Sequence, residues 1–254
     1  MAASPMEQFE VVRLIELRLP EALGGYDISF TNQALWMCVV VVATSLLMTL
    51  PLMRARLVPT RMQSMAELSY QFVADMLNMT SGHDGLKFFP LIFTVFMFIL
   101  MSNFFGLIPG SFTVTSQIAV TFALTALVIL TVIVTGFARH GLGFLKLFVL
   151  DAPIYIAAPM ALLEFLAFCA RPISLSLRLF ANMLAGHTML VVMAGFVVAL
   201  IGAGGFLSAL SIAPMLLIIG LGALEILVAF LQAYVFAILS CIYLNEALHL
   251  HEHH

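Results

Sequence analysis

Residues 157–201 read AAPMALLEFLAFCARPISLSLRLFANMLAGHTMLVVMAGFVVALI, a run of 45 residues whose composition is helical from end to end. As one helix this run would be about 68 Å long at ~1.5 Å per residue, roughly twice the hydrocarbon thickness of a bilayer. A second run of 40 residues, 207–246, follows after the linker Gly202-Ala203-Gly204-Gly205. The two runs predict a long helical hairpin that lies steeply tilted in a membrane.

An alternative is that each run folds back on itself inside the membrane. Pro159, Pro172 and Pro214 are points where a helix can bend, because neighbouring helices can satisfy the carbonyl group that a proline leaves unpaired. Neither run contains a visible turn signal. We therefore favour the tilted hairpin.

The composition of the whole chain agrees with a membrane location. Hydrophobic residues make up 63% of the sequence and charged residues 9%, whereas about 25% charge is usual in soluble proteins. A net charge of -3 offers no basic face for nucleic acid. We find no glycine-rich phosphate loop and no nucleophile motif, and no linker separates one part of the chain from another. We expect one all-α integral membrane domain, residues 1–254, that is not an enzyme by itself.

The first half of the chain predicts shorter elements. Residues 34–53 are uncharged and match the ~20 residues that a helix needs to cross a bilayer. Residues 88–108 and 117–138 are two further uncharged runs that predict a spanning hairpin. Residues 63–79 have a helical period but are too polar to span, which predicts an amphipathic helix along the membrane surface. Residues 1–33 form an outer N-terminal segment.

Positive charges predict the orientation of these elements. Arg54, Arg56 and Arg61 follow the first span, and Arg139 and Lys146 follow the third. Basic residues accumulate on the cytoplasmic side of membrane proteins. The sequence therefore predicts an outer N-terminus and a cytoplasmic C-terminus.

Ionisable residues inside the long hairpin are candidates for function, because such groups are costly to bury in a bilayer. Glu164, Arg171 and Arg178 recur every seven residues, nearly two helical turns, and share one face with Asn182. His187 lies nine residues after Arg178, which at about 100° per residue is the opposite side of the helix. The arginine and the histidine can therefore face different surroundings.

The second run contributes Glu225 and Gln232, which share a helix face because they are seven residues apart. If the chain reverses at residues 203–204, Gln232 lies within a turn of the level of Arg178. Glu225 then lies slightly more than a turn from the level of His187. The hairpin therefore predicts two groups of polar residues at different heights, one with Arg178 and Gln232 and one with His187 and Glu225.

Structural ion pairs are the simpler interpretation of some of these residues. Glu164 could pair with Arg171, and Glu225 with His187. Arg178 has no acidic residue within a turn on its own helix, or level with it on the second run. Its carboxylate partner must come from elsewhere in the chain or from another chain.

The chain resembles subunit a of F-type ATP synthases in the segment Ser174-Leu-Ser-Leu-Arg178-Leu-Phe-Ala-Asn182-Met-Leu-Ala-Gly-His187. The resemblance extends to Leu231-Gln232-Ala-Tyr-Val-Phe236, Ile242-Tyr-Leu-Asn-Glu246 and Ser4-Pro-Met-Glu-Gln-Phe9, and so covers nearly the whole chain. Many bacterial members carry the acid and the histidine at positions 187 and 225 in the opposite order. The order found here is similar to that of the mitochondrial and alphaproteobacterial branch.

The resemblance implies a stator beside a rotating c-ring, whose subunits each carry a proton on one membrane-embedded carboxylate. Arg178 then corresponds to the essential arginine that separates two aqueous half-channels, and Gln232 to its polar neighbour on the last helix. An arginine keeps its proton at any accessible pH, so it can attract a ring carboxylate without relaying protons itself.

The remaining polar residues would line the two half-channels. His187 and Glu225 suit proton delivery from the outer side, with Asn103 as a weaker candidate for the same route. Glu164 would belong to the inner exit route. Ser174 and Asn182 flank the arginine, where interhelical hydrogen bonding is nearly as good an explanation as a channel role.

The resemblance also implies partners and a location. It implies contact with the c-ring, with subunit b of the peripheral stalk and with the remaining F0 and F1 subunits, without a cofactor or metal. The membrane would be a bacterial inner membrane or, alternatively, a mitochondrial one. A self-contained secondary ion transporter, which would need an inverted repeat and broken helices, and a purely structural assembly subunit are the competing interpretations.

Overall fold

A computed structural model of the chain describes residues 10–15, 29–53, 58–108, 111–141, 143–144 and 154–248. Most of the expected outer segment, together with Arg54, Arg56 and Lys146, lies outside these residues. Two compact units make up the structure and are described separately. Unit 1 comprises Met1–Leu46, Phe98–Gln117 and Leu179–Gln232, and unit 2 comprises Leu47–Met97, Ile118–Arg178 and Ala233–His254.

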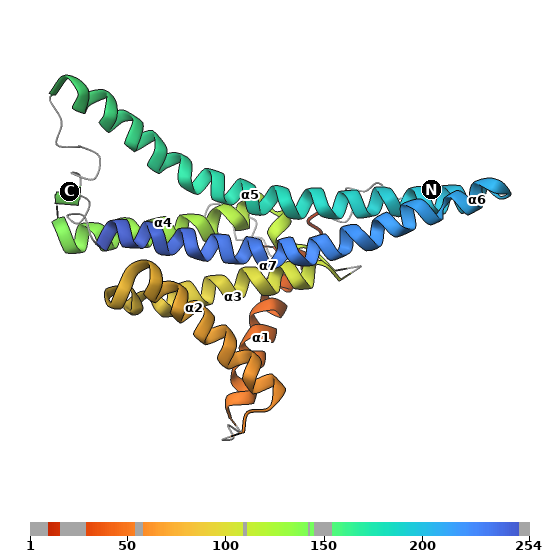
Figure 1. Cartoon of the computed structure of the whole chain (residues 1–254), viewed down its shortest axis with the longest axis horizontal. Helices are drawn as coiled ribbons and strands as arrows, with labels where there is room; N and C mark the ends of the chain where they lie inside the picture. The colour runs from red at the N-terminus through yellow and green to blue at the C-terminus, as the bar shows by residue number, and fades with distance from the viewer. Residues whose placement is uncertain are drawn as a thin grey trace. The chain divides into compact units, whose positions relative to one another are not determined.

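The described residues are almost entirely helical (Figure 1). The helices are α1 (Asn32–Leu52), α2 (Arg61–Gly85), α3 (Phe89–Gly106), α4 (Ile118–His140), α5 (Ile154–Ala203), α6 (Phe206–Leu210) and α7 (Ile212–Leu248), with short 3-10 turns η3 (Leu86–Phe88) and η4 (Val114–Ser116). Two short strands, β1 (Arg13–Ile15) and β2 (Phe30–Thr31), pair antiparallel. Five helices are long and apolar enough to cross a membrane. The predicted all-α membrane fold with two long C-terminal helices is confirmed.

Polar side chains fix the start of α1 in unit 1. Thr31 Oγ1 accepts a hydrogen bond from the backbone N–H of Ala34 at 3.3 Å, as a capping residue does. Asn32 Oδ1 accepts from the backbone N–H of Val12 at 3.2 Å. These bonds tie the strand pair to the first turn of α1.

The long hairpin reverses through a left-handed turn in unit 1. α5 is one helix of 50 residues, and Pro159 and Pro172 lie inside it without ending it. Gly204 and Gly205 follow with φ of +68° and +61°, a backbone conformation that glycine adopts at little cost. Figure 1 shows the unit 1 parts of α5 and α7 running side by side next to this turn. The folded-back alternative for residues 157–201 is therefore excluded.

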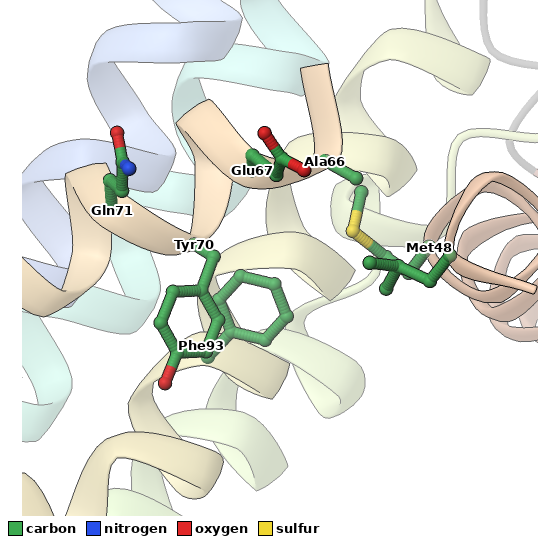
Figure 2. A pocket seen from close by; sticks show the side chains of 7 residues that line it. Met48, Ala66, Glu67, Tyr70, Gln71 and Phe93 are labelled. Atoms are coloured by element: carbon green, nitrogen blue, oxygen red, sulfur yellow. The ribbon is translucent and has the colours of Figure 1, made fainter. Parts of the chain in front are cut away.

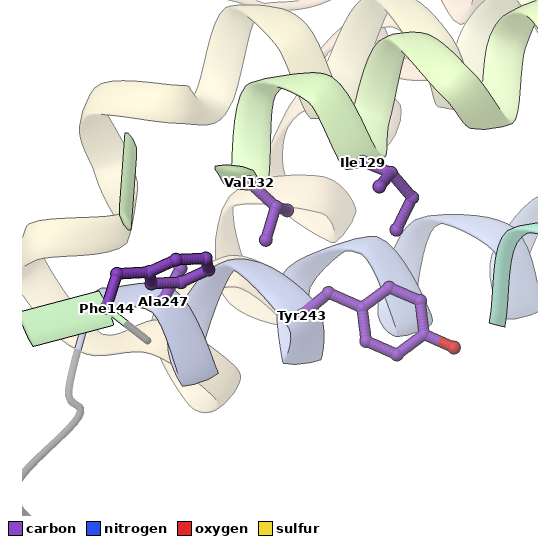
Figure 3. Close-up of a cluster of buried hydrophobic side chains, with 5 residues drawn as sticks. All are labelled: Ile129, Val132, Phe144, Tyr243 and Ala247. Carbon is purple, nitrogen blue, oxygen red and sulfur yellow. The ribbon is translucent and has the colours of Figure 1, made fainter. Parts of the chain in front are cut away.

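The core of unit 2 holds the C-terminal part of α7 against α4. Ile129 and Val132 of α4 pack with Phe144, Tyr243 and Ala247 (Figure 3). The close approach depends on a glycine in α4, because a Cβ atom at position 136 would overlap the Phe144 ring. This packing fixes the position of Tyr243, which belongs to the candidate site.

A salt bridge joins two helix ends in the same unit. Asp84 Oδ2 lies 3.1 Å from Arg139 Nη1, so the end of α2 is tied to the last turn of α4. Lys87 lies 3.8 Å from the same carboxylate, although its side chain is 71% exposed. Surface pairs of this kind contribute little stability. The apolar core is the main constraint on this part of the fold.

Candidate functional site

Arg171 is the centre of an ionic cluster in unit 2. Its guanidinium forms salt bridges with Glu164, at 3.6 Å, and with Glu246 near the end of α7. The guanidinium carbon also lies 5.1 Å from the ring centroid of Tyr243, within the range of a cation–π interaction. The predicted pair of Glu164 and Arg171 is present, and the sequence did not reveal that Glu246 completes it.

A cavity of about 330 Å3 lies beside this cluster. It is large enough for several water molecules. Its polar lining comes from Arg171, Ser174, Arg178 and Tyr243, and its apolar lining from Ala167, Ala170, Leu175 and Leu239. All of these residues belong to unit 2. The cavity brings the two arginines and Ser174 to one space that water can occupy.

The surroundings of Arg178 differ from those of Arg171. Within the residues that the structure describes, Arg178 takes part in no hydrogen bond and no salt bridge. Its side chain is exposed, whereas Leu175 and Leu179, about 60° and 100° around the helix from it, are 1% and 0% exposed. The helix therefore buries an apolar stripe and turns the arginine outward.

One turn after Arg178, a polar contact joins the two long helices in unit 1. Asn182 Nδ2 donates a hydrogen bond to Gln232 Oε1 at 3.1 Å. A reversal at residues 203–204 would have set Asn182 level with Glu225, which lies seven residues before Gln232 in α7. The expected register was wrong because α6 extends the turn and moves the point of reversal towards the C-terminus.

Glu225 lies against α5 at Gly186. A Cβ atom at position 186 would overlap the Glu225 carboxyl group in its present position, so a larger residue there would displace that side chain. Both carboxyl oxygens of Glu225 are buried and accept no hydrogen bond from the described residues. Leaving such oxygens unsatisfied is costly. The carboxyl group is therefore available to water or to an exchanging proton.

His187 follows directly after Gly186 but is not hydrogen-bonded to Glu225. Its Nε2 atom lies 3.4 Å from Thr113 Oγ1 in the segment before α4. Glu225 therefore lies against the residue that precedes His187, and the proximity of the two side chains stays a prediction.

Asn103 is fully buried near the end of α3. Its Nδ2 atom donates to the backbone carbonyl of Ala229 at 3.2 Å, and its Oδ1 atom accepts from Thr115 Oγ1 at 2.9 Å. These bonds tie α3 and η4 to α7 within unit 1. Structural anchoring accounts for this asparagine, and a channel role for it stays a prediction.

Comparisons with known proteins agree on one family. Residues 34–245 match the family model described as ATP synthase A chain. The chain is 53% identical over 246 residues to ATP synthase subunit a of Mesorhizobium japonicum, with 96% of each chain covered. It is 51% identical over 249 residues to the subunit a of Bartonella bacilliformis, covering 98% of this chain and 97% of the relative. For Chelativorans sp. the identity is 52% over 250 residues, covering 98% and 99%.

The different surroundings of the two arginines lead to a stability prediction. Arg171→Gln removes both salt bridges and leaves two carboxylates unpaired, so it should lower the free energy of unfolding by about 1–2 kcal/mol, discounted for partial exposure. Arg178→Gln, the same substitution seven residues later, removes no hydrogen bond or salt bridge of the described residues and should change the free energy of unfolding by less than about 0.5 kcal/mol. Thermal unfolding of the purified chain in detergent measures both. Equal destabilisation by the two variants would contradict the assignment.

Proposed function

We propose, on the premise that the chain belongs to the ATP synthase A chain family, that Arg178 faces the carboxylates of a rotating c-ring and separates two proton half-channels. As a member of this family the chain is a membrane component of an ATP synthase that serves proton transport and is not catalytic alone. One observation supports the proposal most strongly. Arg178 is exposed and has no partner among the described residues, whereas Arg171 on the same face pairs with two carboxylates.

The guanidinium would act on the ring by its fixed charge. A ring carboxylate that reaches Arg178 is favoured in its ionised form and gives up its proton to the exit route. After it passes the arginine, it takes a proton from the entry route and becomes neutral. A neutral carboxylic acid can rotate through lipid at far lower cost than a carboxylate. The arginine itself never releases a proton, so it blocks a direct path between the two routes.

The outer route would use the unit 1 residues. Glu225 supports this role because its buried carboxyl oxygens have no donor among the described residues. His187, one residue after the glycine that Glu225 contacts, would exchange protons with it through water. Asn182 and Gln232 would hold the two helices together at the inner end of this route through their 3.1 Å hydrogen bond.

The inner route would use the cavity of unit 2. Ser174 and Arg178 line the cavity together with Arg171 and Tyr243. Arg171 in turn forms salt bridges with Glu164 and Glu246. Water in this cavity could carry a proton from the ring towards these carboxylates. We add Glu246 to the expected residues of this route because it shares Arg171 with Glu164.

The remaining assignments concern location and partners. We place the N-terminus outside and the C-terminus in the cytoplasm of a bacterial inner membrane, because the relatives come from bacteria and Arg61 and Arg139 follow spanning helices. The c-ring would contact the exposed face of α5. Subunit b and the remaining F0 and F1 subunits would complete the complex, and the long hairpin would lie tilted along the ring.

Replacement of Arg178 tests the proposed function. Arg178→Ala should leave the complex assembled but abolish ATP-driven proton pumping, because nothing then separates the routes or attracts the ring carboxylate. Arg178→Lys should also fail, since a lysine that the ring covers in the assembled complex can lose its proton and lacks the planar fork. Acidification of inverted vesicles measures pumping, and Arg61→Ala, outside the long hairpin, serves as the control that should pump normally. Normal pumping by Arg178→Ala would refute the proposal.

Exchange of His187 and Glu225 tests the outer route. The double variant His187→Glu with Glu225→His restores one acid and one base at the same place, so it should conduct more protons than either single variant. Proton flux through the four proteins gives a double-mutant cycle. A coupling no larger than the ~0.3–0.5 kcal/mol expected for independent sites would mean that the two residues do not act together.

A further inference from the structure

An apolar cleft lies between the end of α1, the first half of α2 and the start of α3, away from the ionic residues of the long hairpin (Figure 2). Its volume is about 310 Å3, and its lining comes from Met48, Leu52, Ala66, Glu67, Tyr70, Gln71 and Phe93. We propose that this cleft binds one phospholipid whose headgroup carries a primary amine, with an acyl chain in the cleft and the ammonium at Glu67. The site is independent of the proposed proton routes.

The walls of the cleft are held by aromatic packing. Tyr70 stands with its ring centroid 4.5 Å from that of Phe89 and 6.2 Å from that of Phe93. Phe89 and Phe93 stack on one another at 5.4 Å. Figure 2 shows Tyr70 and Phe93 together on one side and Met48 of α1 across from them. The cleft is therefore formed by packed side chains of three helices.

The volume and lining of the cleft suit part of one extended hydrocarbon chain. Met48 and Leu52 on one side and Phe93 on the other would cover it with apolar surface.

The position of the cleft along the chain matches the boundary between hydrocarbon and headgroups. α1 is apolar and long enough to span, and Leu52 is its last residue. α2 is not among the helices that could span, and it presents Met65 and Leu68 as exposed apolar residues. A helix of this kind lies in the interface of a bilayer. A lipid that enters the cleft with its acyl chain therefore has its headgroup near the first half of α2.

Glu67 gives the site its preference for an amine. It is the one acidic residue in the lining of the cleft, and its Oε1 atom accepts a hydrogen bond from Gln63 Nε2 at 2.8 Å. A carboxylate has about four lone-pair positions, so this bond orients it and leaves room for further donors. A primary ammonium has three N–H donors and a positive charge, whereas a choline group has no N–H donor. An anionic headgroup without an amine would be repelled.

Native mass spectrometry of the full chain in detergent can test this site. The probes are phosphatidylethanolamine, phosphatidylcholine and phosphatidylglycerol with identical acyl chains. The natural sequence should retain phosphatidylethanolamine about three- to fivefold better than the other two, as one partly exposed ion pair allows. Glu67→Gln should reduce this ratio to about one. Asp75→Asn is the matched control, because it removes an acid from the same helix outside the cleft and should keep the preference.

A second variant tests the acyl chain. Met48→Trp fills the cleft from the side of α1 and should lower the retention of all three lipids. Equal retention of the three lipids by the natural sequence, or an unchanged preference in Glu67→Gln, would overturn the proposal. If Met48→Trp lowers the yield of the assembled complex and leaves lipid retention unchanged, a side chain of a neighbouring subunit fills the cleft and the lipid proposal is wrong.

Discussion

A guanidinium group inside a bilayer needs a carboxylate close by, because the charge is costly in a medium that cannot solvate it. The chain meets this need for Arg171, which has Glu164 on its own helix and Glu246 on α7. Among the described residues, Arg178 has no such carboxylate. The same helix thus contains one arginine paired with two carboxylates and one that has no salt bridge among the described residues. The proposed contact of Arg178 with a ring carboxylate rests on that difference.

The long helices make this arrangement possible. Polar residues recur at multiples of seven positions on both, at 164, 171 and 178 on α5 and at 225, 232 and 246 on α7. This spacing keeps them near one face of each helix, and groups seven residues apart are separated by about 10 Å along it. Leu175 and Leu179 bury the side of α5 next to Arg178. Each unit therefore contains its own polar contact between the two helices, Asn182 with Gln232 in unit 1 and Arg171 with Glu246 in unit 2.

Composition and periodicity were sufficient to predict the helical membrane fold and the two long helices, because apolar runs of 40 residues or more leave few alternatives. They were also sufficient to predict the pairing of Glu164 with Arg171, which are on one helix. Contacts between the helices depend on the exact point of reversal, and α6 shifted it. Glu246 was therefore missed as a partner of Arg171. The contact of Glu225 with Gly186 depends on the same register and on a missing Cβ atom, which a periodic pattern does not reveal.

Disulfide cross-linking to the ring tests most directly whether the partner of Arg178 lies outside the chain. The assembled complex would lack the native cysteines Cys38, Cys169 and Cys241 and carry one new cysteine on α5 and one beside the ring carboxylate. Ser174 and Asn182 are exposed on either side of Arg178, and Leu179 is buried. Since a disulfide requires Cα atoms within about 7 Å, cysteines at positions 174 and 182 should cross-link to the ring and a cysteine at 179 should not. Efficient cross-linking at 179, or none at 174 and 182, would contradict the account.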